Sequence, residues 1–77
     1  MPREPTHGEY RVGISFNPSG NPRVEEIKKL AAEFIDLCAH LQDPDADGEV
    51  KRLWALAMTH MEDGAMWAVK AATKPPR

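Results

Sequence analysis

The sequence PRVEEIKKLAAEFIDLCAHL, residues 22–41, decides the fold of this chain. Its apolar side chains recur every three or four positions, which is the spacing of an amphipathic helix with one wide apolar face. These positions are Val24, Ile27, Leu30, Ala31, Phe34, Ile35, Cys38 and Leu41. Asn21 suits the N-cap of such a helix, and Pro22 suits its first position. We therefore predict a first helix over residues 22–41.

A second helical pattern covers residues 49–73, and an acidic loop over residues 42–48 separates it from the first. Two helices joined by a short loop favour an antiparallel hairpin. The apolar side chains of the second helix spread over more than one face, so the first helix cannot cover them all. We expect the excess to contact other subunits: Trp54 or Trp67, Met58 and Met66, with Gly64, Ala65, Ala68 and Ala72 allowing close helix approach.

The length of 77 residues allows one small domain, residues 1–77. A chain this short buries only about 60% of its unfolded surface, so an isolated fold is marginal. Its one cysteine excludes an intrachain disulfide, which leaves a homo-oligomer as the expected stabiliser. The longest apolar run, Ala65 to Val69, is too short for a membrane span. The N-terminus lacks the apolar core of a secretory signal, and a single thiol fits a reducing compartment, so we expect a cytoplasmic protein.

Residues 1–21 form an N-terminal arm that ends in a turn. Tyr10, Val12, Ile14 and Phe16 alternate with polar or small residues, which is a strand pattern. No second strand is predicted to pair with it, so the segment either pairs across a subunit interface or runs extended over the helices. The predicted fold is all-α: an antiparallel two-helix hairpin with an extended N-terminal arm, assembled into a homo-oligomer.

The charges are segregated along the chain although the net charge is only −2. Residues 30–49 contain acids and no Lys or Arg: Glu33, Asp36, Asp43, Asp45, Asp47 and Glu49. A hairpin brings the cations of both chain ends together: Arg23, Lys28 and Lys29 with Lys70, Lys74 and Arg77. We therefore expect a basic end and an acidic end. An extended DNA or RNA partner is not favoured, because the cations are few.

The acidic loop resembles the first half of a calcium-binding loop. Asp43, Asp45 and Asp47 occupy ligand positions, but Trp54 stands where the completing glutamate belongs. An aspartate that caps the second helix is the simpler interpretation. The three histidines lie in separate segments, and no nucleophile with a base partner is recognisable, so neither a metal site, a cofactor nor an enzyme is expected.

The basic end carries groups that suit a compact ligand containing phosphates and bases. Lys28 lies near a helix N-terminus, where the dipole favours an anion. Tyr10 and Phe16 can stack on bases, while Asn17 and Ser19 can hydrogen-bond to base edges. The alternative is that Phe16 is a core residue and that the lysines near the C-terminus only complement a helix dipole.

The arm, the sequence Ile27-Lys-Lys-Leu-Ala31, the acidic loop and the sequence Gly64-Ala-Met-Trp-Ala-Val-Lys70-Ala-Ala-Thr73-Lys74 together resemble the small phage anti-CBASS proteins that act as cyclic-oligonucleotide sponges. The resemblance covers about residues 10–74. It implies a hexamer of helical hairpins in the host cytoplasm. Such a hexamer sequesters cyclic di- and trinucleotides without cleaving them and so blocks host antiviral signalling.

The resemblance also implies roles for particular residues. Lys28 corresponds to the lysine that contacts phosphate, and Phe16, with Tyr10 as second candidate, corresponds to the aromatic that stacks on a base. Lys70 and Thr73 correspond to a second pocket, where the family commonly has an arginine whose bidentate fork a lysine lacks. The complete predicted ligand-binding set is Tyr10, Arg11, Phe16, Asn17, Ser19, Lys28, Lys70 and Thr73, with the Asn17 to Ser19 loop closing over the ligand. Two other hypotheses are a structural or adaptor hairpin without a small-molecule ligand, and a weak calcium-binding protein.

Overall fold

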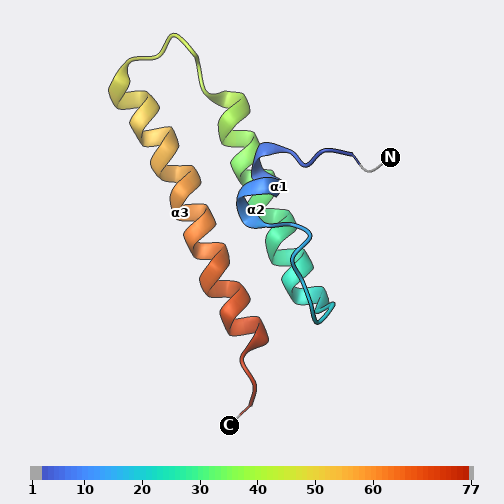
Figure 1. Cartoon of the computed structure of the whole chain (residues 1–77). Coiled ribbons are helices and arrows are strands. Elements are labelled where there is room, and N and C mark those ends of the chain that lie inside the picture. The colour runs from blue at the N-terminus through green and yellow to red at the C-terminus, as the bar shows by residue number, and fades with distance from the viewer. Residues whose placement is uncertain (1–2, 77) are drawn as a thin grey trace.

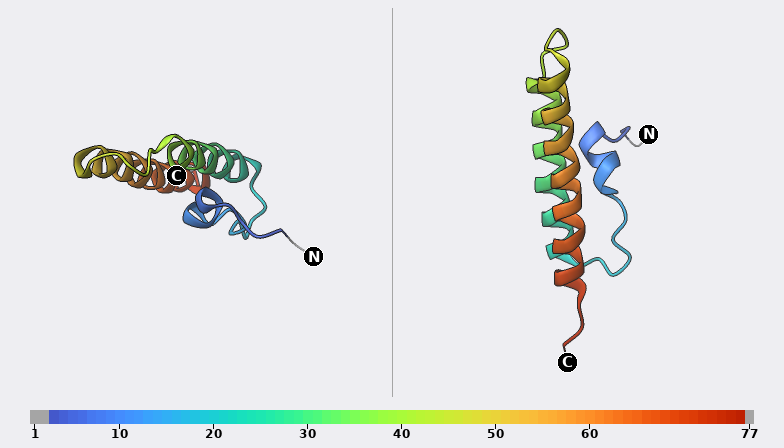
Figure 2. Two further views of the ribbon diagram at one scale, coloured as in Figure 1. Left: turned by 90° about the horizontal axis from the view of Figure 1, so that it is seen from above. Right: turned by 90° about the vertical axis from the view of Figure 1, so that its left-hand side faces the viewer.

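The computed structural model describes residues 3–76. Three helices follow one another, α1 (His7–Val12), α2 (Pro22–Leu41) and α3 (Gly48–Thr73), and no strand occurs within residues 3–76. The helices α2 and α3 run side by side in opposite directions, and α1 packs on one side of this pair (Figures 1 and 2). The predicted helical hairpin is therefore confirmed.

Side chains that were recognisable in the sequence cap both long helices. Asn21 Oδ1 accepts a hydrogen bond from the Arg23 amide at 2.9 Å, and Pro22 is the first residue of α2. Asp47 Oδ1 accepts from the Val50 amide at 3.0 Å, so α3 begins at Gly48, one residue before the predicted start. The capping interpretation of the acidic loop is confirmed for Asp47. Across the residues that the structure describes, no group of three or more His, Cys, Asp or Glu side chains is placed to hold a metal ion.

The predicted strand and extended arm are wrong, because residues 7–12 form the helix α1. A capping box starts this helix: Thr6 Oγ1 accepts from the Glu9 amide at 3.1 Å, and Glu9 Oε1 accepts from the Thr6 amide at 2.9 Å. Gly13, at a φ of 65°, ends it in the left-handed conformation that glycine adopts freely. An alternating run this short does not distinguish a strand from a helix of under two turns. The pattern of Thr6 followed three residues later by Glu9 was the sequence signal that indicates a helix here.

The core lies where α2 crosses the middle of α3. Ile35 is fully buried there, with Cys38 and Met58 beside it. Met58 is only 8% exposed, so the prediction that it faces another subunit is wrong; its side chain packs on α2 within the same chain. Trp54 packs partly buried against this core, whereas Met66 and Trp67 are each 63% exposed. Only part of the predicted apolar excess therefore points outward.

The hairpin is a flat, open structure. Its radius of gyration is 14.2 Å, whereas a compact chain of this length has about 11.5 Å. Its accessible surface is 6047 Å², whereas a compact monomer of this mass exposes about 4,700 Å². The apolar stripe of α2 splits into an inner buried half and an outer exposed half. We call the exposed row of apolar side chains on α2 the apolar face; it consists of Leu30, Phe34, Leu37 and Leu41. Leu53, Leu56 and Trp67 of α3 are exposed as well. No helix among the described residues is both long enough and apolar enough to cross a membrane.

Candidate functional site

A cavity of about 330 Å³ lies between the loop that follows α1, the start of α2 and the end of α3. We call it the arm cavity. Its lining consists of Phe16, Asn17, Pro18, Ser19, Val24, Lys28, Val69 and Thr73. Five of these were predicted from the sequence: Phe16, Asn17, Ser19, Lys28 and Thr73. The volume is at the lower end of the range of about 300 to 1,000 Å³ that is typical of small-molecule sites.

The side chain of Lys28 is the chemical centre of this cavity. It is buried, with 7% of the residue exposed, and its Nζ donates to the carbonyl oxygens of Gly13, at 2.9 Å, and of Phe16. Nζ also lies 5.4 Å from the centroid of the Phe16 ring, within the range of a cation–π contact. An ammonium has three N–H donors, so these two bonds leave one for a further acceptor. The site thus combines a held cation, a free donor and an aromatic ring.

The arm cavity has a positive lining. Lys28 is the one charged residue among those that form it, and none of them is a carboxylate. By contrast, glutamates line the cavities beside Arg11 and beside Tyr10, Glu62 in the first and Glu9 in the second. An anion in the arm cavity therefore meets a cation without a competing negative charge close by, which favours phosphate.

The loop over the cavity is held by its own side chains. Asn17 Nδ2 donates to the Asn21 carbonyl at 2.9 Å, and the Asn21 amide donates to Asn17 Oδ1 at 3.1 Å. Asn21 Nδ2 reaches the Ala72 carbonyl at 3.4 Å, which joins the start of α2 to the end of α3. The amide of Asn17 is thus used to shape the loop. Ser19 is exposed, and the hydroxyl of Thr73 donates to the Val69 carbonyl at 2.8 Å.

Tyr10 and Arg11 lie outside this lining. Tyr10 is 78% exposed and lines a neighbouring cavity of about 300 Å³, of which Phe16 forms another wall. Arg11 Nε donates to Glu62 Oε1 at 2.8 Å, and its Nη2 reaches Thr59 Oγ1 at 3.3 Å. Arg11 therefore ties α1 to α3. Phe16 is the residue that the two cavities share.

Lys70 also lies outside the arm cavity. Its Nζ is 5.4 Å from the centroid of the Trp67 ring on the outside of α3. Arg23, Lys29 and Lys74 are exposed, while Arg77 is outside the described residues. The start of α2 does lie beside the end of α3, but Arg23 and Lys29 line two other cavities, and among these described cations only Lys28 is buried.

Sequence reasoning missed Pro18, Val24 and Val69, which also line the arm cavity. Both valines were recognised as apolar positions of the two helices. Setting the helices antiparallel would have placed Val24, near the start of α2, opposite Val69, near the end of α3. Hairpin register was therefore the signal that could have identified them.

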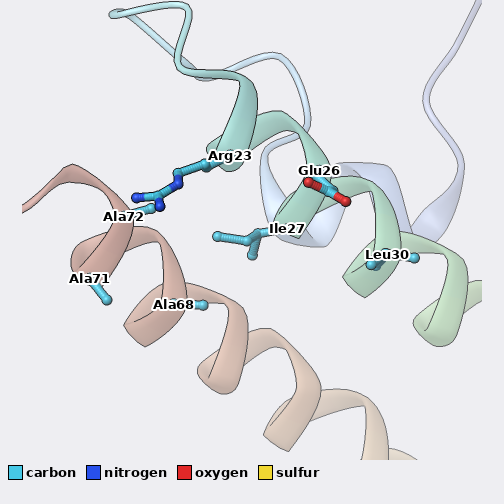
Figure 3. Close-up of a pocket in the computed structure, with 7 residues that line it drawn as sticks. All are labelled: Arg23, Glu26, Ile27, Leu30, Ala68, Ala71 and Ala72. Carbon is cyan, nitrogen blue, oxygen red and sulfur yellow. The ribbon is translucent and has the colours of Figure 1, made fainter.

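A larger groove, of about 460 Å³, lies between the start of α2 and the end of α3, bordering the apolar face. Figure 3 shows Ile27 and Leu30 of α2 above Ala68 of α3, with the Arg23 side chain extending toward Ala72. Glu26 also lines this groove. None of the predicted ligand-binding residues lines it, so we do not assign the ligand to it.

The ion pair between Arg3 and Glu9 stabilises the start of α1. The guanidinium binds the carboxylate through two hydrogen bonds, of 2.9 and 3.0 Å. These bonds, with the hydrogen bond from the Thr6 amide, lower the pKa of Glu9 from 4.5 to about 2. Because the folded-state pKa is depressed, the stability that Glu9 contributes is present above pH 4.5 and is lost as the pH falls toward about 2.

We predict that α1 loosens in acid before the hairpin does. The amide signals of Gly8 and Tyr10 in an NMR pH titration should shift toward random-coil positions between pH 4.5 and about 2. Replacing Arg3 with glutamine should shift this transition toward higher pH, because the main cause of the lowered pKa is removed. An Arg3→Gln variant with the same transition as the wild type would contradict the assignment.

Comparison with known protein families identifies the same part of the chain. The family described as "Acb2/Tad1, hairpin domain" matches residues 9–73 of this chain, a range that contains α2, α3 and the whole lining of the arm cavity. The comparisons with curated proteins and with solved structures give no match. The family consists of binding domains rather than enzymes. This chain therefore belongs to the Acb2/Tad1 hairpin-domain family, the anti-CBASS sponges of cyclic oligonucleotides.

Proposed function

We propose that this protein binds cyclic di- or trinucleotides in the arm cavity and holds them without chemical change. We further propose that it is encoded by a phage and acts in the host cytoplasm, where it lowers the free concentration of the messenger and blocks antiviral signalling. Membership of the family supports the ligand class. The observation that carries the assignment to this site is that Lys28 and Phe16 line one cavity whose lining has no carboxylate.

The proposed complex uses each feature of the cavity. The remaining N–H of Lys28 donates to a phosphate oxygen, a charge-assisted bond that is stronger than a neutral one. A base stacks on the exposed ring of Phe16, an interaction worth about 1 to 3 kcal/mol per base. Tyr10, on the neighbouring cavity, is the candidate for a second base. Ser19 and Thr73 supply hydroxyl groups at the rim, and Lys70 with Thr73 remains the candidate for a second pocket.

We also propose that the protein is a homo-oligomer, with a hexamer as the expected state. The chain exposes about 1,300 Å² more than a compact monomer of its mass. That excess is larger than the roughly 800 Å² that each partner contributes to a specific interface of standard size. A single layer of two helices leaves its second side without a covering layer, and stable domains need at least two packed layers. A second copy on the apolar face supplies that layer.

Calorimetric titration with cyclic di-AMP, cyclic GMP-AMP and cyclic tri-AMP tests the proposal. We expect saturable binding of at least one of them, and recovery of the same nucleotide unaltered after the protein is denatured. A lack of binding across all three, by a protein that nevertheless assembles, would instead support the structural or adaptor hypothesis. Recovery of a linearised nucleotide would show that the protein is an enzyme and not a sponge.

A further inference from the structure

One side of α2 binds both ends of α1. Lys28, Ala32 and Asp36 are spaced by four residues, so they lie in a row along one side of the helix. Lys28 binds the C-terminal end of α1 and the loop after it, as described above. Asp36 binds the N-terminal end of α1, and Ala32 lies between them. The arm therefore runs antiparallel to α2 along this row (Figure 2).

Asp36 makes two short hydrogen bonds to the arm. Its Oδ1 accepts from the Gly8 amide at 2.7 Å, and its Oδ2 accepts from the Thr6 hydroxyl at 2.7 Å. The Gly8 amide is one of the first amides of α1, which have no acceptor within the helix. Thr6 is at the same time the N-cap of α1 through Glu9. One carboxylate thus closes the start of α1 and fixes it to α2.

Gly8 makes this attachment close. A Cβ atom at this position would lie 2.2 Å from the backbone oxygen of Ala32 and 2.9 Å from Asp36 Oδ1. Because backbone cannot yield as a flexible side chain does, only glycine lets α1 rest directly on α2 here. The position of α1 is therefore set by contact with backbone as well as by Asp36.

The charges of Asp36 and Lys28 are opposite to the partial charges at the two ends of α1. The carboxylate of Asp36 lies at the N-terminal end of α1, where the helix dipole is positive, and the ammonium of Lys28 lies at the C-terminal end, where it is negative. Lys28 also belongs to the arm cavity, but Asp36 does not. Asp36 can therefore be changed without removing any group that lines the proposed ligand site.

We propose that Asp36 is a positioning residue for ligand binding: it holds α1 on α2, so that the loop carrying Phe16 is placed over Lys28 before the ligand arrives. This inference rests on the function proposed above. The arm exists in a docked and an undocked state, and only the docked state has a complete arm cavity. The apparent dissociation constant equals the intrinsic one divided by the docked fraction, so loss of Asp36 weakens binding without altering the site itself.

The coupling is reciprocal, and this separates positioning from general stabilisation. If docking of the arm strengthens ligand binding, the ligand must strengthen docking by the same factor. In a chain without the Asp36 carboxylate, a bound nucleotide should therefore restore the protection of α1. A residue that merely stabilised the hairpin would show no such recovery confined to α1.

The experiment compares Asp36→Ala, Asp36→Asn and the control Glu33→Ala, which removes an exposed carboxylate from the same helix. Hydrogen exchange of the amides of residues 8–12, 23–41 and 48–73 is measured for each variant without ligand. It is then repeated with whichever of cyclic di-AMP, cyclic GMP-AMP or cyclic tri-AMP the wild type binds best, and its affinity is measured by calorimetry.

For Asp36→Ala we expect faster exchange confined to α1, binding weakened roughly tenfold or more, and recovery of α1 protection when the nucleotide is added. Asp36→Asn keeps an acceptor for Gly8 and a donor toward Thr6, so it should lose less affinity and less α1 protection than Asp36→Ala. Glu33→Ala should match the wild type in both. Wild-type affinity in Asp36→Ala overturns the positioning role and leaves the proposed function standing. Faster exchange throughout α2 and α3 also overturns it, since Asp36 is then a general stabiliser. Failure of the wild type to bind any of the three nucleotides overturns the proposed function and the positioning role together.

Discussion

Replacing Lys28 with methionine is expected to weaken cyclic-nucleotide binding by roughly 100-fold. The substitution keeps an unbranched side chain of similar length but removes the ammonium. A hydrogen bond to a charged group contributes about 1.5 to 3 kcal/mol, and each 1.4 kcal/mol changes affinity about tenfold. The variant also loses the bonds to the Gly13 and Phe16 carbonyls, so the loop that carries the stacking ring is less well placed. Both losses act in the same direction.

Lys29→Met is the matched control for this measurement. Lys29 is the next residue of α2, carries the same charge and is exposed, and it does not line the arm cavity. Calorimetry should give it an affinity within a few-fold of the wild type, while sedimentation should show the same assembly for both variants. Equal losses in the two variants would mean that lysine acts only through net charge. Unchanged affinity in Lys28→Met would place the ligand elsewhere.

Replacing Leu37 with glutamate is expected to convert the proposed oligomer into monomers. Leu37 is 49% exposed at the centre of the apolar stripe of α2, and it makes no part of the buried core around Ile35. A carboxylate buried there without a partner costs several kcal/mol, so the association constant should fall by about a thousandfold or more. Glutamate forms helices well, so circular dichroism should still show α2.

Ala39→Glu controls for the added charge. Ala39 is exposed on the same helix but lies two residues further on, about 200° around the axis and therefore away from the apolar face. Sedimentation velocity should show the wild-type assembly for Ala39→Glu and a monomer for Leu37→Glu. If Leu37→Glu keeps the wild-type mass, the apolar face is not the subunit interface.

The hairpin was predictable because several local signals agree with one another. The periodic apolar residues, the Asn21 cap and Pro22 all indicate a helix that begins at residue 22, and α2 begins there. The arm was mispredicted because its alternating residues are compatible with a strand and with a short helix. Only the capping pair Thr6 and Glu9 distinguishes the two. In α1 the spacing that suggested a strand leaves Tyr10 exposed while Val12 packs on the core.

The candidate site was predictable in part, because only some of its contacts join residues that are close in the sequence. Phe16, Asn17, Ser19 and Lys28 come from neighbouring segments, so a hairpin start brings them together with Thr73. The burial of Lys28 was not predictable, because it depends on where the Gly13 and Phe16 carbonyls lie. The docking of α1 on α2 through Asp36 and Gly8 sets their position, and that contact joins residues 28 apart in the chain.

Copies of this chain are proposed to assemble and to retain an unmodified cyclic nucleotide. Native mass spectrometry with a mixed pool of cyclic di-AMP, cyclic GMP-AMP and cyclic tri-AMP tests this proposal directly, because it reports the number of subunits and the mass of the ligand together. We predict a homo-oligomer that gains whole multiples of the mass of one intact cyclic nucleotide. A monomer, or an oligomer whose mass the pool leaves unchanged, would contradict the account.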